Sequence, residues 1–167
     1  MNPLPQLHVD IDTRVSAIRD SQPDWLCRQG CDGCCRRLAQ VPEITLAEWR
    51  CLQEGLKALP SEQLREVGRE IAALIDQKAR PIICPLLDKA KGACLIYAHR
   101  PVACRTYGFY VQREQGLYCK DIEARVSGGL LADVVWGNHD GIDHCLRALG
   151  DARELPAWFA EWQPDRA

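Results

Sequence analysis

The sequence predicts a mainly α fold, a small helical domain interrupted by irregular cysteine-rich loops. Apolar residues recur at intervals of three and four in several segments, which is the spacing of a helix with one buried face. Capping residues and proline mark where those segments begin. Eight of the ten cysteines fall in two stretches, the first with Gly and the second with Gly and Pro, and these stretches are predicted to be largely loops.

The N-terminal 24 residues are polar and flanked by proline. A weak apolar stripe predicts a short helix there, formed by Val9, Ile11, Val15 and Ile18. The next segment, WLCRQGCDGCCRRL, contains Gly30 and Gly33, which permit sharp backbone turns. We expect this segment to be a loop that becomes helical near its end.

A helical hairpin is predicted next. Thr45 and Glu48 have the spacing of a capping box, so a helix should cover about 46–58. Pro60 separates it from a second helix, for which Ser61 is the predicted cap. The second helix is predicted from one apolar face, made of Leu64, Val67, Ile71, Leu74 and Ile75.

Residues 81–119 carry four of the cysteines, with Pro and Gly between them. Pro101 suits the first position of a short helix containing Cys104, because that position makes no use of an amide hydrogen. Further helical patterns lie near 121–135, 142–149 and 155–162.

The composition is that of a globular chain, 47% hydrophobic and 26% charged. A net charge of -2 gives no field that would concentrate nucleic acid, and no stretch approaches the roughly 18 apolar residues of a membrane span. The N-terminus lacks the basic start and apolar run of a secretory signal. We therefore expect a cytoplasmic protein with reduced thiols and with no nucleic-acid or membrane partner.

The first cysteine cluster reads Cys27-x3-Cys31-x2-Cys34-Cys35. A C-x2-C pair lets two thiols of one turn reach the same metal, so Cys31 and Cys34 are the strongest candidate ligands. Cys35 should leave the backbone in another direction than Cys34. It would then reach a second metal atom, a cluster iron, or nothing.

The second cysteine group consists of the singletons Cys84, Cys94, Cys104 and Cys119. It contains no second C-x2-C pair, which excludes a zinc ribbon. Dispersed ligands fit an iron-sulfur cluster, whose irons can be approached from several segments, and equally an irregular zinc site. Arg100 and Arg105 bracket Cys104, and their charge would offset that of metal-bound thiolates, as would Arg36 and Arg37.

Other patterns favour simpler interpretations. Cys51 and Cys145 lie in predicted helices and are expected to be small core residues. A disulfide framework is disfavoured because the chain shows no secretion signal. His139 and His144 are five residues apart, which does not suit one helical face, so this segment is interpreted as a polar loop leading into a capped helix.

Over residues 25–120 the chain resembles the YkgJ-like (CxxCxxCC) family of bacterial and archaeal proteins described as zinc- or iron-chelating cysteine-cluster domains. The resemblance lies in WLCRQGCDGCC, ITLAEW, CPLL, CLIYAHRPVACRTYG and LYC, which follow the family pattern in order. It implies eight metal-binding cysteines: Cys27, Cys31, Cys34, Cys35, Cys84, Cys94, Cys104 and Cys119. Three residues rather than two separate Cys27 from Cys31, which departs from the family's spacing.

The fold prediction is then a single domain over 1–167, with irregular cysteine-rich loops wrapped around a metal site in residues 25–120 and a helical C-terminal extension over 121–167. The leading functional hypothesis is a protein that binds zinc or iron, with a 4Fe-4S cluster as one form, in a structural, redox or accessory role. An iron-sulfur-dependent enzyme of redox chemistry or methyl transfer, related to flagellin lysine N-methylases, is the first alternative. A metal buffer or delivery protein is the second.

Overall fold

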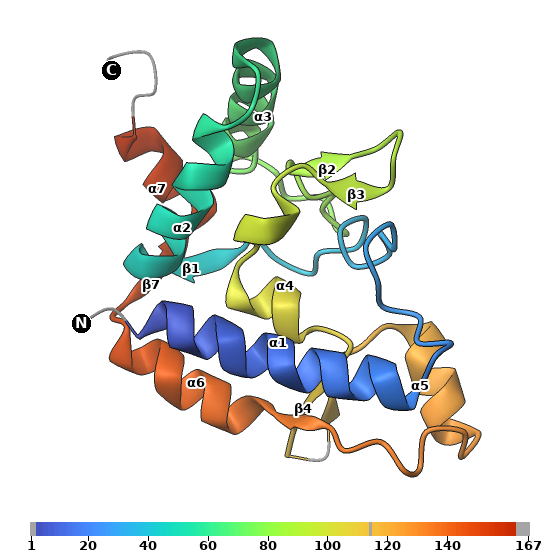
Figure 1. The fold of residues 1–167 in the computed structure, drawn as a ribbon. Helices are drawn as coiled ribbons and strands as arrows, with labels where there is room; N and C mark the ends of the chain where they lie inside the picture. Colours follow the sequence, from blue (N-terminus) through green and yellow to red (C-terminus); the bar gives the residue numbers. More distant parts are fainter. Residues whose placement is uncertain (1–2, 114, 163–167) are drawn as a thin grey trace. The chain divides into compact units, whose positions relative to one another are not determined.

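The computed structural model describes residues 3–113 and 115–162, and Figure 1 shows the chain as a ribbon. Seven α-helices, one short 3-10 helix and seven short strands lie among the described residues, so the mainly α prediction is confirmed. The chain divides into two compact units. Unit 1 comprises Met1–Arg28 and Pro101–Gly150, and unit 2 comprises Gln29–Arg100 and Asp151–Ala167. Residues of the predicted extension 121–167 therefore contribute to both units.

Unit 1 is built on the long helix α1, Leu4–Ser21, against which the short helix α4, Val102–Thr106, packs (Figure 1). Its small sheet has the order β5-β4-β6. Strand β4 pairs antiparallel with β5 and parallel with β6. The strands and the other helices of unit 1 have these bounds: β4 Tyr110–Gln112, β5 Gln115–Gly116, α5 Lys120–Ser127, β6 Gly137–Asn138 and α6 His139–Ala148.

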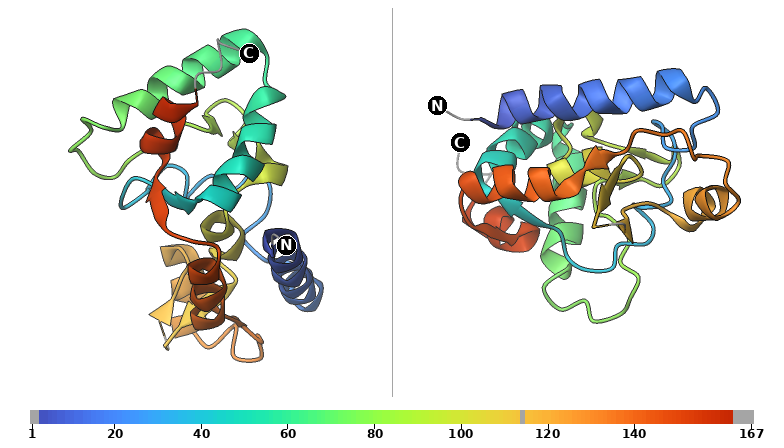
Figure 2. Two further views of the ribbon diagram at one scale, coloured as in Figure 1. Left: turned by 90° about the vertical axis from the view of Figure 1, so that its left-hand side faces the viewer. Right: turned by 90° about the horizontal axis from the view of Figure 1, so that it is seen from below.

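Unit 2 is held together by a hydrophobic core between helices α2, α3 and α7. Helix α7 packs against α3 (Figure 2), and strand β1 pairs antiparallel with β7 just before α2 and α7 begin. Leu52, Leu56 and Ile71 are completely or almost completely buried in this core. The elements are β1 Glu43–Thr45, α2 Leu46–Lys57, α3 Ser61–Ala73, β2 Leu87–Asp88, β3 Ala93–Cys94, the 3-10 helix η1 Tyr97–His99, β7 Ala152–Glu154 and α7 Leu155–Glu161.

Several element predictions need correction. Val9 is 57% exposed, so the buried face of α1 uses Leu4 and Leu7 in its place. The loop after α1 contains turns, one of them around Cys34 and Cys35, and no helix. Helix α5 ends at Ser127, well before 135, because two glycines follow it and Gly129 has a φ of +73°.

The capping box of α2 is confirmed. Thr45 Oγ1 accepts a hydrogen bond from the Glu48 amide at 3.3 Å, and Glu48 Oε2 accepts from the Thr45 amide at 2.9 Å. Both residues are buried. Ser61, in contrast, is the first residue of α3 and makes no capping hydrogen bond, so its predicted role is wrong.

Replacing Thr45 by Val is expected to lower the free energy of unfolding by about 1–2 kcal/mol, because it keeps the side-chain volume and removes the buried cap. Urea denaturation followed by circular dichroism measures this loss. Ser61→Ala is the matched control, since Ser61 starts the neighbouring helix without a side-chain cap, and it should change stability by less than about 0.5 kcal/mol. Equal losses in the two variants would contradict a stabilising role for the box.

Candidate metal centre

Three segments of unit 2 carry the thiols of Cys34, Cys35, Cys84 and Cys94, which we call the thiol cluster. The first is the turn at residues 32–36, closed by a hydrogen bond from the Arg36 amide to the Asp32 carbonyl at 3.0 Å and by the Arg36–Asp32 ion pair at 2.6 Å. The second is the extended segment before Pro85. The third is the β2–β3 hairpin, in which Leu87 pairs with Cys94.

The backbone brings the first two segments together. Leu38 and Ile82 form an antiparallel bridge with two hydrogen bonds of 2.9 Å. Two residues further along, the Cys84 amide donates to the Cys35 carbonyl at 2.7 Å. The side chains of Leu38 and Ile82 pack with Leu74 in a small hydrophobic cluster, which fixes the positions from which Cys35 and Cys84 project.

The four thiols interact with one another. Cys34 hydrogen-bonds to Cys35 through its side chain, and Cys35 does so to Cys84. The charge of Cys94 acts on Cys35, and the charge of Cys34 acts on Cys94. The expectation that Cys35 points away from Cys34 is therefore wrong. Cys31, the other half of the C-x2-C pair, is exposed.

The clustering shifts the acidity of these thiols. The hydrogen bond with Cys35 and burial raise the pKa of Cys34 far above its usual range. For Cys35, the hydrogen bond from Cys34 acts to lower the pKa, but the hydrogen bond with Cys84, burial and neighbouring charges raise it to about 12. Burial raises the pKa of Cys94, and the charge of Arg100 opposes that shift. Without a metal Cys34, Cys35 and Cys94 thus retain their protons, and a bound cation would displace them.

Within residues 3–113 and 115–162, no three His, Cys, Asp or Glu side chains already have an arrangement that could hold a metal ion. The donor chemistry of the thiol cluster nevertheless fits zinc or iron, since four soft sulfur donors from three segments face one another. Each of the four thiols interacts with at least one other, through a side-chain hydrogen bond or through charge.

Three of the predicted ligands lie in unit 1 and not in the unit that carries the thiol cluster. Cys27, Cys104 and Cys119 belong to unit 1. Cys104 is exposed on α4, and Cys119 is the residue immediately before α5. The Cys27 carbonyl accepts hydrogen bonds from Arg19 at 3.0 and 3.3 Å. The eight predicted ligands are therefore divided between the units, five in unit 2 and three in unit 1.

The two arginines predicted to offset metal charge also differ. Arg100 lies in unit 2, where its guanidinium is stacked 3.6 Å from the centre of the Tyr97 ring and donates to the Tyr97 carbonyl at 2.9 Å. This fixed guanidinium acts on Cys94. Arg105 lies in unit 1, is 9% exposed, and donates to both carboxylate oxygens of Asp12 at 2.9 and 3.1 Å. Sequence reasoning missed both the Tyr97 stack and the Asp12 partner.

A buried histidine accompanies Arg105. His8 Nε2 is buried and has no hydrogen-bond partner in the described part of the chain. Burial first, and then the charge of Arg105, lowers the pKa of His8 to about 4, although Asp12 opposes the shift. Since the fold favours neutral His8, this contribution to stability is complete above the unfolded pKa of 6.5 and is lost as pH falls towards 4.

Unfolding measured between pH 7 and pH 4 should therefore show a loss assigned to His8. We expect about 1–2 kcal/mol, allowing for solvent screening of a half-buried group. His8→Gln should make the pH dependence shallower across this window, because glutamine does not titrate. An unchanged slope in the variant would show that His8 is not the titrating group. His144→Gln, on the exposed surface of α6, is the control and should leave the slope unchanged.

The two cysteines outside the predicted ligands, Cys51 and Cys145, differ in exposure. Cys145 is exposed, so its prediction as a core residue is wrong, whereas Cys51 is half-buried in α2. Asn138 caps α6 by accepting from the Asp140 amide at 3.0 Å, so a capped helix is present. The helix begins at His139 and contains both His139 and His144, so the prediction that these histidines lie in a polar loop is wrong. His139 Nδ1 lies 3.2 Å from Asp143 Oδ1 on the same helix.

Cys27 packs against a glycine that cannot be replaced easily. Gly108 has a φ of +86°, and a Cβ atom there would collide with Cys27 Sγ. Gly108→Ala should therefore destabilise the protein by about 1–3 kcal/mol or more. Adding Cys27→Ala should recover the part due to collision, leaving the backbone strain, and thermal unfolding of the single and double variants measures both.

The control is Gly141→Ala in α6, where an added Cβ meets nothing within 4 Å. It should be neutral or stabilising by up to about 1 kcal/mol, because alanine favours helix. If Gly108→Ala matched this control, the close packing of Cys27 would be contradicted.

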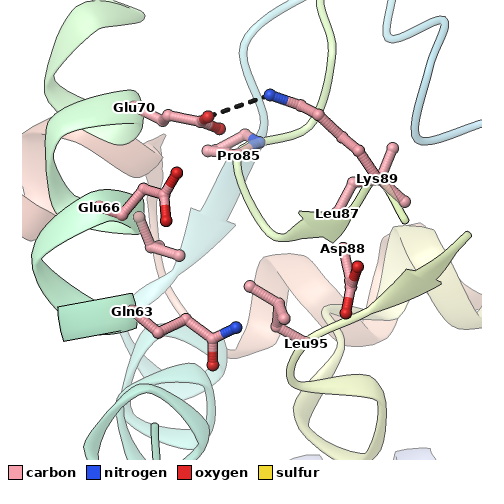
Figure 3. Close-up of a pocket in the computed structure, with 9 residues that line it drawn as sticks. Gln63, Glu66, Glu70, Pro85, Leu87, Asp88, Lys89 and Leu95 are labelled. Atoms are coloured by element: carbon pink, nitrogen blue, oxygen red, sulfur yellow. Dashed lines mark hydrogen bonds and ion pairs between the residues drawn. The ribbon is translucent and has the colours of Figure 1, made fainter. Parts of the chain in front are cut away.

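A cavity of about 230 Å³ lies between α3 and the β2–β3 hairpin (Figure 3). Its lining includes Pro85 and Leu95, which directly follow Cys84 and Cys94. The Lys89–Glu70 ion pair of 3.0 Å crosses it and ties the hairpin to α3. The hairpin that carries Cys94 is thus braced by a helix of the unit 2 core.

The fold and the thiol cluster define a class: a mainly α protein with a cysteine cluster suited to a soft metal. A model of the CxxCxxCC family, described as "Putative zinc- or iron-chelating domain", matches residues 26–123. The chain belongs to this family, which confirms the resemblance found in the sequence. No curated protein and no solved structure gave a significant match. None of the described helices is long and apolar enough to cross a membrane.

Proposed function

We propose that the protein binds zinc or iron through Cys34, Cys35, Cys84 and Cys94. The observation that carries this proposal is the meeting of four thiols from three separate segments. Buried thiols are common as single core residues, but several thiols that interact with one another are unfavourable once any of them loses its proton. A cation removes that cost and binds all four sulfurs as thiolates. The family description supports the same chemistry.

The role that fits best is structural. The metal, when bound, would supply a cross-link between the turn at 32–36, the segment before Pro85 and the hairpin that carries Cys94. In the described residues these segments have only short strands and single turns to hold them. Metal-binding energy in such loops is folding energy. Arg100, held over Tyr97, would offset part of the negative charge of the thiolate set.

Within unit 1, Cys27, Cys104 and Cys119 stay proposed as ligands of a second ion, and within unit 2 Cys31 stays proposed as a further ligand beside the thiol cluster. The identity of the metal is tested on protein purified without oxygen, by elemental analysis and an ultraviolet-visible spectrum. Stoichiometric zinc in colourless protein would support a structural or buffering site. Iron with sulfide and broad brown absorption would support a 4Fe-4S or related cluster. Protein with neither metal would overturn the proposal.

A cluster-dependent enzyme is the second candidate, and the cavity in Figure 3 is the observation that favours it. Two of its lining residues are the chain neighbours of proposed ligands, so a molecule bound there would lie close to the metal. Enzymes of this kind require an open coordination position. A metal with four protein sulfurs, unchanged in its spectrum when small molecules are added, would exclude this role.

A further inference from the structure

We propose that Cys35 and Cys84 form a reversible disulfide when the protein is oxidised, and that this cross-link expels the metal. The inference rests on the proposed function only for the metal release. The cross-link itself follows from the geometry of the thiol cluster. Disulfides of reduced compartments are mostly transient and redox-sensing, and this pair has the arrangement such a device needs.

The pairing follows from the backbone. The Leu38–Ile82 bridge and the hydrogen bond of 2.7 Å from the Cys84 amide to the Cys35 carbonyl hold the two segments antiparallel and adjacent. The Cα of Cys84 is one covalent bond from the donor nitrogen of this hydrogen bond, and the Cα of Cys35 is two bonds from the acceptor oxygen. The two Cα atoms therefore lie close together, as a disulfide requires. The two side chains also make a hydrogen bond to each other, so the sulfurs already face one another.

The competing pair within the turn is disfavoured. Cys34 and Cys35 are chain neighbours, and consecutive Cα atoms are only about 3.8 Å apart across a trans peptide, shorter than a relaxed disulfide allows. Their hydrogen bond brings the thiols together without relieving that constraint. Cys94 contributes from a separate hairpin, and no side-chain hydrogen bond joins it to Cys35 among the interactions of the described residues. Cys35–Cys84 is therefore the first cross-link expected.

Hydrogen peroxide would oxidise the Cys35 and Cys84 thiols to a disulfide in two steps. The Cys84 thiol gives up its proton and attacks a peroxide oxygen; the O–O bond breaks, a sulfenic acid forms on Cys84, and the departing hydroxide takes that proton to leave as water. The second thiol attacks the sulfenic sulfur, the S–S bond forms, and the hydroxyl leaves with that thiol's proton as a second water. Two thiols lose two electrons and peroxide gains them. Two of four proposed ligands are then unavailable, so the metal is lost.

The test oxidises the full-length protein with one equivalent of hydrogen peroxide, in parallel for the metal-loaded and the chelator-treated forms. Trypsin places Cys35 in the peptide 29–36 and Cys84 in the peptide 79–89, and fragmentation between residues 34 and 35 assigns the linked sulfur. We expect these two peptides to be joined through Cys35 in both forms. Dithiothreitol should reverse the link and restore metal binding.

Variants sharpen the assignment. Cys34→Ser and Cys145→Ser should keep the cross-link, and Cys35→Ser should lose it. Fragmentation of the unmodified protein decides the pairing even if a variant fails to fold. A dominant link between Cys34 and Cys35, or sulfinic acids without a link, would overturn the inference. If the link forms in a protein that never contained metal, the proposed function is overturned and the cross-link stands. If the protein binds metal but forms no link, the cross-link is overturned and the proposed function stands.

Discussion

Cys84→Ser protein purified without oxygen should contain far less metal than the unmodified protein. Substitution of residues that merely orient a ligand costs about 10–100-fold in metal affinity, and loss of a ligand should cost at least that. Serine keeps the size of the side chain, but its hydroxyl does not ionise near neutral pH and binds soft metals poorly. Elemental analysis after dialysis against a weak chelator measures the loss.

Cys145→Ser is the matched control, because Cys145 is exposed on α6 and outside the predicted ligands. It should retain the full metal content. Circular dichroism distinguishes loss of a ligand from loss of the fold, since the helices α2, α3 and α7 have a hydrophobic core of their own. A Cys84→Ser protein with unchanged metal and unchanged affinity would remove Cys84 from the site.

Removal of the metal by excess chelator should loosen the parts of unit 2 that carry the thiol cluster. Structural zinc contributes roughly 10–16 kcal/mol of binding free energy in small zinc domains. Because unit 2 also has its own hydrophobic core, we expect metal removal to lower its free energy of unfolding by several kcal/mol. Hydrogen exchange should then show faster exchange in the turn at 32–36 and in the β2–β3 hairpin. Helix α1, whose buried face packs within unit 1, should keep its protection.

Re-addition of the metal provides the control, because it should restore slow exchange in both segments. An apo-protein with the same melting curve and the same exchange pattern as the metal-loaded protein would contradict a structural role for the metal. It would leave binding itself intact and would favour the buffer or delivery hypothesis.

Local signals in the sequence predicted most of the helices. The Thr45–Glu48 box predicts the start of α2 correctly, because the two residues that form it are only three positions apart in the sequence. Ser61 carries an equally plausible local signal, yet Pro60 occupies the cap position and α3 begins one residue earlier than expected. The apolar stripe of that helix includes Ile75, which is 67% exposed. Helical spacing identifies a face but does not set where packing against other elements ends.

Long-range pairing could not be predicted. The spacing of Cys31 and Cys34 favoured these two as partners, whereas the structure pairs Cys34 with Cys35 and Cys35 with Cys84. The approach of residue 84 to residue 35 depends on the Leu38–Ile82 bridge and on a small cluster of Leu38, Val41, Leu74 and Ile82. Nothing in a window of neighbouring residues specifies such a contact. The same holds for the pairing of Arg105 with Asp12 across 93 positions.

X-ray absorption at the metal edge tests the central claim most directly, on a variant in which only Cys34, Cys35, Cys84 and Cys94 remain and the other six cysteines are replaced by serine. We expect bound metal with four sulfur neighbours, at about 2.3 Å if the metal is zinc. The unmodified protein, measured beside it, should give the same first-shell sulfur distance. A folded variant that binds no metal, or a first shell dominated by nitrogen and oxygen, would contradict it.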